Sequence, residues 1–196
     1  MKKIFVTGST GFLGSSVVRL LVAKGYEVHC LKRQNSNLLR LNGILDKINL
    51  VALEGINFID YFSEHKIDSV LHCATNYGRN ENKPIDTIEA NLLLPLKILY
   101  AASVTNVKSF INTDTILDKR INHYSLSKKQ FLSWLETYSK NLICVNVVLE
   151  HFYGPGDDPS KFVALMIKEM LNYSDKINLT AGEQKRDFIY IDDVVN

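Results

Sequence analysis

The chain has 196 residues, of which 46% are hydrophobic and 22% are charged, and its formal net charge is +2. This composition excludes a disordered or fibrous chain, and the near balance of acidic and basic residues gives no indication of binding to nucleic acid or to a membrane surface. No apolar run approaches the roughly 18 to 20 residues that a membrane span requires, and the apolar start is predicted to be a buried strand rather than a signal peptide.

Short apolar runs alternate with segments of helical apolar spacing along most of the chain. We predict strands at Lys3–Thr7, Glu27–Leu31, Ile48–Leu53, Ser69–Ala74, Val107–Asn112 and Leu142–Leu149. We predict helices at Gly11–Lys24, Leu38–Leu45, Phe58–His65, Ile85–Asn106, Tyr124–Lys140 and Lys161–Leu171. Pro95 is expected to kink the long helix that contains it.

Apolar strands separated by helices predict an α/β fold with a doubly wound, Rossmann-like parallel sheet that is covered on both faces. We expect residues 1–150 to form an NAD(P)-binding Rossmann domain. The alternation of strands and helices stops after this point, at a cluster of turn residues over Gly154–Pro159. Residues 151–196 are expected to be the start of a substrate-binding region that is only begun and is truncated.

The three cysteines, Cys30, Cys73 and Cys144, are far apart and have no metal-ligand spacing. Each lies in an apolar run, so we expect small core residues in a reducing compartment. The sequence therefore predicts a cytoplasmic protein without a metal site.

Gly8, Gly11 and Gly14 form a GxxGxxG pattern between the first strand and the first helix. Glycine permits the sharp turn, the approach of the backbone to a pyrophosphate and the close packing of the helix on the sheet. The helix N-terminus adds free N–H groups and a positive dipole end. The alternative is a glycine-rich turn without a ligand. We predict a dinucleotide site with contacts from Gly8, Thr10, Gly11, Phe12, Leu13, Gly14 and, after the fourth strand, Ala74.

The end of the second strand bears on the form of the cofactor. A carboxylate there would bind the adenosine ribose hydroxyls, but this strand runs into Lys32 and Arg33. Two cations at this position favour a 2′-phosphate, since guanidinium matches phosphate geometry. We therefore predict NADP, with NAD as the alternative and a solvated loop edge as the reading without a ligand.

Tyr124 and Lys128 are four residues apart at the start of a predicted helix, which places both side chains on one face. The ammonium of Lys128 is expected to lower the pKa of Tyr124, since a free tyrosine titrates near 10. Such a tyrosine exchanges a proton with a substrate oxygen while hydride moves on the cofactor. Lys128 is also expected to bind the nicotinamide ribose.

Four features follow one another in order: TGxxGxxG, the strand end Asn112–Thr115, the Tyr124 and Lys128 pair, and the segment Arg186–Val194. With them the chain resembles the extended short-chain dehydrogenase/reductase family, which includes nucleotide-sugar epimerases, dehydratases and reductases. The resemblance covers nearly the whole chain. It implies an NAD(P)-dependent enzyme that acts on a nucleotide-sugar substrate.

The resemblance also implies roles for individual residues. It assigns the catalytic hydroxyl to Thr113, with Thr115 as the alternative if the register is shifted and as a substrate contact otherwise. His151 stands where the family has an asparagine near the nucleotide-sugar phosphates, and Arg186 matches an arginine that contacts the diphosphate. The alternatives are a structural histidine and a surface cation.

Thr115 departs from the Thr-Asp-Glu motif of the family's 4,6-dehydratases, in which the carboxylates help to eliminate water. We therefore expect reduction or epimerisation rather than dehydration. The position of Asp114 resembles that of an aspartate in the family's 4-keto-sugar reductases. We expect an NADP-dependent 4-keto-sugar reductase acting on a nucleotide-activated deoxysugar. The alternatives are a nucleotide-sugar epimerase, a 4,6-dehydratase and a non-catalytic NAD(P)-binding sensor.

Members of the family often form dimers through two long helices. The resemblance implies a homodimer through residues 85–106 and 124–140. Members also continue beyond the segment that ends this chain, so cofactor binding without turnover is a possible outcome of truncation.

Overall fold

The computed structural model describes residues 1–79, 83–172 and 176–196. The chain divides into two compact units, Met1–Leu149 and Glu150–Asn196, which we call the first and the second unit. Each unit is built around its own pairing of parallel strands. The assignment of the second unit to substrate binding remains a proposal.

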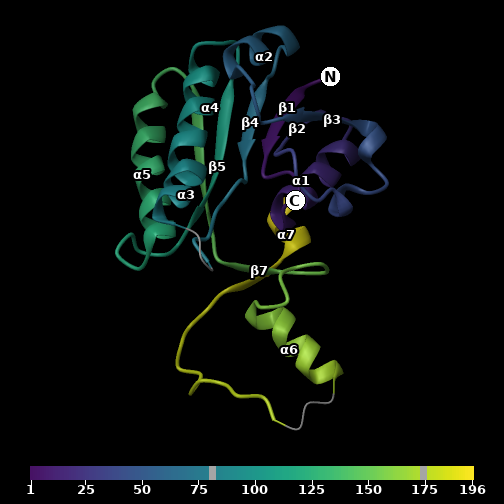
Figure 1. Cartoon of the computed structure of the whole chain (residues 1–196), viewed down its shortest axis with the longest axis vertical. Helices are drawn as coiled ribbons and strands as arrows, with labels where there is room; N and C mark the ends of the chain where they lie inside the picture. The colour runs from purple at the N-terminus through teal and green to yellow at the C-terminus, as the bar shows by residue number, and fades with distance from the viewer. Residues whose placement is uncertain (80–82, 173–175) are drawn as a thin grey trace. The chain divides into compact units, whose positions relative to one another are not determined.

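The first unit contains a six-stranded parallel sheet in the order β3-β2-β1-β4-β5-β6 (Figure 1). Its strands are β1 Lys3–Thr7, β2 Glu27–Lys32, β3 Ile48–Ala52, β4 Ser69–His72, β5 Ser109–Thr115 and β6 Ile143–Leu149. This is the order of a dinucleotide-binding Rossmann sheet, so the predicted fold class is confirmed.

Helices cover both faces of this sheet (Figure 1). They are α1 Phe12–Ala23, α2 Phe58–His65, α3 Pro84–Ile88, α4 Leu94–Ser103 and α5 His123–Tyr138. Alternate residues of β1 face opposite ways: Val6 packs with Val18 of α1, whereas Phe5 packs with residues of α2, α4 and α5. The period of two in each strand therefore builds two cores, one on each face.

The predicted helix over residues 38–45 is wrong. The segment instead forms two short 3-10 turns, Leu39–Leu41 and Leu45–Lys47. Gly43 lies between them with a φ of +81°, a left-handed conformation that interrupts a helix.

The long helix predicted over residues 85–106 is present in three pieces. A π-helical turn, Glu89–Leu93, separates α3 from α4. It ends just before Pro95, which has no N–H and cannot complete the helical hydrogen-bond ladder. The expected kink is thus taken up by a π turn, a feature often found at functional sites.

The fifth strand runs further than predicted. It was expected to end at Asn112, but β5 continues to Thr115 and pairs with β6 over its whole length. Both candidate threonines therefore lie within the strand rather than in the loop that follows it.

The second unit contains β7 His151–Tyr153, α6 Phe162–Leu171, β8 Phe188–Tyr190 and α7 Ile191–Val195. The helix was predicted from the sequence, whereas the short parallel pair β7–β8 was not. The pair aligns His151 with Phe188, and the His151 N–H donates a hydrogen bond to the carbonyl of Asp187.

Candidate active site

The glycine-rich turn joins β1 to α1 and lies against the end of β4. Gly8 has a φ of +65°, and a Cβ on it would lie 2.6 Å from the backbone nitrogen of Ala74. A Cβ on Gly14 would lie 2.1 Å from the carbonyl oxygen of Gly8. Any side chain at either position would displace backbone, so the close approach of turn, helix and strand requires glycine at both.

The N-terminus of α1 has neither a side-chain cap nor a compensating charge. Its N-cap residue is Gly11, which makes no side-chain hydrogen bond, and its first turn contains no acidic residue. The positive dipole end of this helix is therefore not offset by a side-chain cap or an acidic residue of its first turn, which favours an anionic ligand there. Together with the two crowded glycines, this geometry fits the pyrophosphate of a dinucleotide.

Thr7 links the ends of the two central strands. Its hydroxyl lies 2.7 Å from Nδ1 of His72 and accepts a hydrogen bond of 3.2 Å from the N–H of Ala74. Strands β1 and β4 are neighbours at the point where the strand order reverses, which is where open α/β sheets bind their ligands. The turn after β1 and the predicted contact Ala74 therefore lie on the same side of this crevice.

The end of β2 carries the two predicted cations together with a carboxylate that the sequence reasoning missed. Lys32 is half-buried and Arg33 is exposed. Glu54, which follows β3, accepts a 2.9 Å hydrogen bond from the N–H of Gln34. This hydrogen bond and the charges of Lys32 and Arg33 lower the pKa of Glu54. A negative charge therefore stands beside the cations proposed to bind a 2′-phosphate.

The start of α5 is set by Asn122, whose side chain accepts a 2.8 Å hydrogen bond from the N–H of Ser125. The Ser125 hydroxyl contacts the N–H of Asn122 in return, which completes a capping box. Because the helix begins at His123, Tyr124 lies in its first turn and Lys128 one turn later. The predicted placement of this pair on one helix is confirmed.

The ammonium of Lys128 is buried without a partner. The side chain is only 1% exposed, and among the described residues its Nζ makes no hydrogen bond. Burial lowers the pKa of Lys128 to about 8, despite the nearby carboxylate of Asp114. An unsatisfied buried donor is costly, and the hydroxyls of a bound ribose are acceptors of the kind that it lacks.

The pKa of the Tyr124 phenol is shifted in the direction opposite to the prediction. Burial raises the pKa of Tyr124 to about 12, while a side-chain hydrogen bond with Thr115 acts in the opposite direction. In the chain by itself, the pKa is therefore raised, not lowered by Lys128 as predicted. The physical reason is that burial of the phenol disfavours its charged form and outweighs the groups that act to lower the pKa.

Tyr77 lies against Tyr124, and Arg79 lies against Tyr77; neither residue was found from the sequence. The ring centroids of Tyr77 and Tyr124 are 5.1 Å apart, and the guanidinium of Arg79 lies 5.1 Å from the centroid of Tyr77. The charge of Arg79 acts to lower the pKa of Tyr124. Both residues come from the segment after β4, which no motif marked.

The two candidate threonines have different partners. Thr113 donates its hydroxyl to the carbonyl of His72 at 3.0 Å, which ties β5 to β4. The Thr115 hydroxyl accepts a 3.2 Å hydrogen bond from the N–H of Leu117 and hydrogen-bonds to Tyr124. The sequence ranked Thr113 first, but these contacts favour Thr115 as the hydroxyl that acts with the tyrosine.

The π turn contributes Asn91 to the neighbourhood of the tyrosine. The buried Asn91 amide donates to the Asn76 carbonyl at 2.8 Å and to the Ser127 hydroxyl at 3.1 Å. Ser127 donates in turn to the carbonyl of Tyr124 at 2.8 Å. This chain of bonds fixes the first turn of α5 against the π turn and the segment after β4.

The predicted substrate contacts His151 and Arg186 both belong to the second unit. His151 lies at the start of β7, with its ring centroid 5.7 Å from that of Phe188. Arg186 is exposed and donates to the carbonyl of Lys185. Because β7 and β8 pair in parallel, the two segments that carry these residues lie side by side within that unit.

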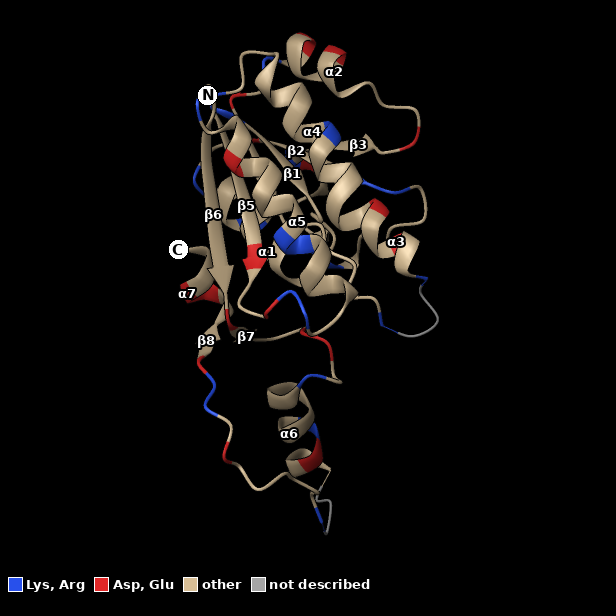
Figure 2. Cartoon of the chain, turned by 90° about the vertical axis from the view of Figure 1, so that its left-hand side faces the viewer, with Lys and Arg blue, Asp and Glu red and all other residues tan. Residues whose placement is uncertain are grey.

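Figure 2 shows basic and acidic positions spread over the elements of the chain. No group of three or more His, Cys, Asp and Glu side chains within the described residues is arranged to hold a metal ion. None of the helices in the described ranges is long and apolar enough to cross a membrane.

Comparison with known proteins gives consistent matches. The model of the NAD dependent epimerase/dehydratase family matches residues 4–196. A CDP-abequose synthase of Salmonella muenchen is 35% identical over 204 residues, which cover 100% of this chain and 68% of that protein.

Solved structures of two epimerases share the fold. A UDP-glucose 4-epimerase of Thermotoga maritima, solved with UDP-glucose, is 26% identical with a TM-score of 0.79, and the match covers 98% of this chain and 71% of that one. A UDP-glucuronic acid 4-epimerase variant of Bacillus cereus, in complex with NAD, is 23% identical with a TM-score of 0.81, over 98% and 70% of the two chains.

Proposed function

Because the chain belongs to the NAD dependent epimerase/dehydratase family, we propose that it reduces the 4-keto group of a nucleotide-activated deoxysugar with NADPH. The name of the Salmonella muenchen relative, CDP-abequose synthase, supports this substrate class, since abequose is a deoxysugar and CDP is its activating nucleotide. Cytidine diphosphate sugars are therefore the first substrates to test.

The observation that carries the proposal is the placement of Tyr124, which lies in the first turn of α5, one turn before Lys128, and hydrogen-bonds to Thr115. Burial raises the pKa of Tyr124 to about 12, so its phenol stays protonated at neutral pH, as that of a free tyrosine does. Reduction of a ketone needs a proton donor at the oxygen, and a protonated phenol supplies it. An epimerase must first oxidise the sugar, for which the same residue has to act as a base. Reduction therefore starts from the protonated phenol, whereas oxidation needs the phenolate.

The proposed roles follow from the contacts. NADPH, when bound, supplies the hydride that adds to the carbonyl carbon. Tyr124 donates its proton to the carbonyl oxygen and Thr115 hydrogen-bonds to the phenol as its charge develops. Lys128 binds the ribose hydroxyls through its buried Nζ. Thr113 is the alternative hydroxyl, and the glycine-rich turn holds the pyrophosphate.

The proposed preference for NADP rests on Lys32 and Arg33 at the end of β2, two cations of the kind that pair with a 2′-phosphate. Glu54 limits this preference, because its charge repels the same phosphate. We therefore propose that both dinucleotides bind and that NADPH binds more tightly.

The second unit is proposed to contribute the contacts with the nucleotide. His151 and Arg186 carry donors that suit a diphosphate, and they lie on neighbouring segments. Replacing Arg186 with Met is expected to raise the KM for the nucleotide sugar while leaving NADPH affinity unchanged.

The test is the oxidation of NADPH, followed by its absorbance, with a panel of nucleotide-activated 4-keto deoxysugars. We expect turnover with at least one of them and its loss in Tyr124→Phe, which should still bind NADPH. An epimerase would change the sugar configuration without net oxidation of NADPH. Binding of the cofactor without any sugar chemistry across the panel would overturn the proposal in favour of a sensor.

A further inference from the structure

A partly buried ion pair joins two neighbours of the proposed active-site residues: Asp114 precedes Thr115, and Lys129 follows Lys128. The Asp114 side chain at the end of β5 is fully buried, and its Oδ2 lies 3.0 Å from Nζ of Lys129. Lys129 comes from α5, immediately after Lys128. The sequence analysis assigned no role to Lys129.

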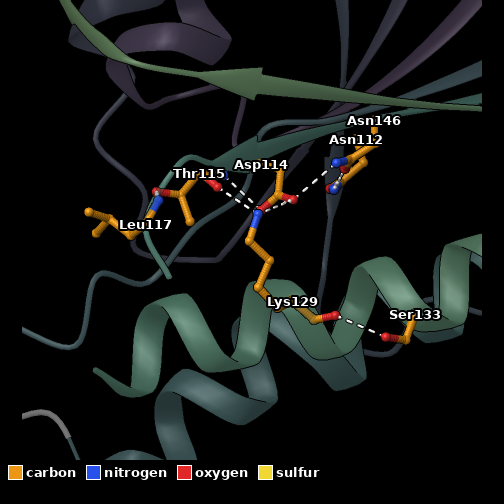
Figure 3. Close-up of polar contacts among 7 residues, drawn as sticks. All are labelled: Asn112, Asp114, Thr115, Leu117, Lys129, Ser133 and Asn146. Carbon is orange, nitrogen blue, oxygen red and sulfur yellow. Dashed lines mark hydrogen bonds and ion pairs between the residues drawn. The ribbon is translucent and has the colours of Figure 1, made fainter. Parts of the chain in front are cut away.

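Three donors bind the Asp114 carboxylate. Oδ1 accepts the N–H of Thr115 at 2.7 Å, and Oδ2 accepts Lys129 and the amide of Asn146 at 3.0 Å each. Asn146 lies on β6 and is itself oriented by the amide of Asn112, which donates to its oxygen at 2.6 Å. The charge is thus held by groups from α5, β5 and β6 (Figure 3).

These donors keep Asp114 ionised. Burial by itself raises the pKa of Asp114, but the hydrogen bonds from Asn146, the Thr115 N–H and Lys129 outweigh it and bring the pKa below its ordinary value. An ionised carboxylate that is held by hydrogen-bond donors has no proton to give. Asp114 is therefore a fixed anion and not a general acid, which separates this site from a dehydratase that relies on carboxylates.

Lys129 also contacts the backbone next to the acting hydroxyl. Its Nζ donates to the carbonyl of Thr115 at 2.7 Å, in addition to the Asp114 carboxylate. Figure 3 shows the side chain reaching from the helix to the end of the strand between these two acceptors. Because α5 also carries Tyr124, one side chain joins the helix that holds the tyrosine to the strand that holds its hydroxyl partner.

We propose that Lys129 is a positioning residue for the reduction: by binding both the Asp114 carboxylate and the Thr115 carbonyl, it holds the Thr115 hydroxyl against Tyr124. This inference rests on the proposed function. In this proposal Lys129 acts through Thr115 and not through a contact with substrate or cofactor. In this proposal the two adjacent lysines of α5 have different roles: Lys128 binds the ribose of the cofactor, and Lys129 holds the end of β5.

The first test compares Lys129→Met, Lys129→Arg and the exposed control Lys140→Met. We expect Lys129→Met to lower kcat by about tenfold to a hundredfold, the effect of a small misplacement of reacting groups, with the KM for NADPH unchanged. Lys129→Arg keeps the charge and should recover part of the loss, and Lys140→Met should match the parent. Parental kcat in Lys129→Met would overturn the inference.

The double variant Asp114→Asn with Lys129→Met separates positioning from simple destabilisation. It removes both charges, so it avoids the unpaired buried carboxylate that threatens the folding of the single variant. We expect the double variant to regain thermal stability but not kcat, because the Thr115 carbonyl is still released. Full recovery of kcat would show that only the unpaired charge mattered and would refute the positioning role.

A measurement without turnover keeps this inference distinct from the proposed function. If the parent reduces none of the sugars, the proposed function fails. The contact between Lys129 and Asp114 can still be tested by following the ¹³C chemical shift of the Asp114 carboxyl as the pH is changed. The signal is assigned by its loss in Asp114→Asn. We expect this carboxyl to titrate below its ordinary range in the parent and at a higher pH in Lys129→Met. The same titration in both proteins would show that Lys129 does not hold Asp114.

Discussion

A Cβ atom on Gly14 would lie 2.1 Å from the carbonyl oxygen of Gly8, closer than any two such atoms can approach. The first turn of α1 therefore rests directly on the backbone of the turn that precedes it. This contact brings the N-terminus of the helix to the ends of β1 and β4, which is the geometry that a pyrophosphate requires.

Replacing Gly14 with Ala should damage both stability and cofactor binding. The added methyl forces the helix away from the turn, and overpacking against backbone costs roughly 3 kcal/mol of unfolding free energy. We expect NADPH binding to be lost in calorimetric titration.

The control for this variant is Gly25→Ala. Gly25 also has a positive φ, of +78°, but a Cβ there meets nothing within 4 Å. Gly25→Ala should lower the free energy of unfolding by only about 1 kcal/mol and leave the NADPH affinity unchanged. Equal NADPH affinities of Gly14→Ala and the parent would contradict the placement of the pyrophosphate at this turn.

Replacing Lys128 with Met should stabilise the cofactor-free chain while it abolishes turnover. The pKa of Lys128 falls from 10.5 to about 8 on burial, which corresponds to roughly 3 kcal/mol of unfavourable free energy for the charged form at neutral pH. Methionine has a similar length and no charge to bury. Chemical denaturation at pH 7 should show the gain, and a less stable variant would argue that Lys128 has a partner in solution.

The same pair of proteins makes a prediction for the pH dependence of stability. Between about pH 8 and pH 10.5 the unfolded chain binds more protons at Lys128 than the folded chain does, so the stability of the parent rises with pH relative to Lys128→Met. The advantage of the variant should therefore be constant below pH 8 and vanish above pH 10.5. A constant difference across this range would contradict the lowered pKa.

The two threonines of β5 should differ in their effect on catalysis. Thr115→Val removes the hydroxyl that contacts Tyr124 and is expected to lower kcat by about a hundredfold or more. Thr113→Val removes a hydroxyl whose proton is already given to the His72 carbonyl, so the loss should be smaller. Steady-state kinetics of both variants decides the assignment, and a larger loss in Thr113→Val would restore the order inferred from the sequence.

Replacing Glu54 with Gln should increase the preference for NADPH over NADH. The change removes the negative charge beside Lys32 and Arg33 while keeping an oxygen that accepts the Gln34 N–H. The ratio of the two dissociation constants, measured by fluorescence titration, reports the effect at low ionic strength, where surface charges are least screened. An unchanged ratio would place the 2′-phosphate away from this carboxylate.

Much of the fold was predictable because its signals are local. Apolar residues recur about every 2 residues in the strands and every 3.6 residues in the helices, and the glycine spacing indicates the turn after the first strand. Tyr124 and Lys128 were found because four residues make one helical turn, so a sequence spacing fixes their spatial relation. The misplaced elements, the segment over residues 38–45 and the end of β5, depended on a glycine conformation and on pairing with β6, which no local period records.

The sequence by itself thus determined the doubly wound sheet, the glycine-rich turn, the cations that end β2 and the tyrosine–lysine pair. Only the tertiary structure decided which threonine meets Tyr124, that Glu54 stands beside Lys32, and that Asp114 is held between Lys129 and Asn146. Asp114 and Asn146 are 32 positions apart in the chain and meet through the register of two parallel strands. Partners of this kind are set by packing across the sheet, and spacing along the chain carries no record of it.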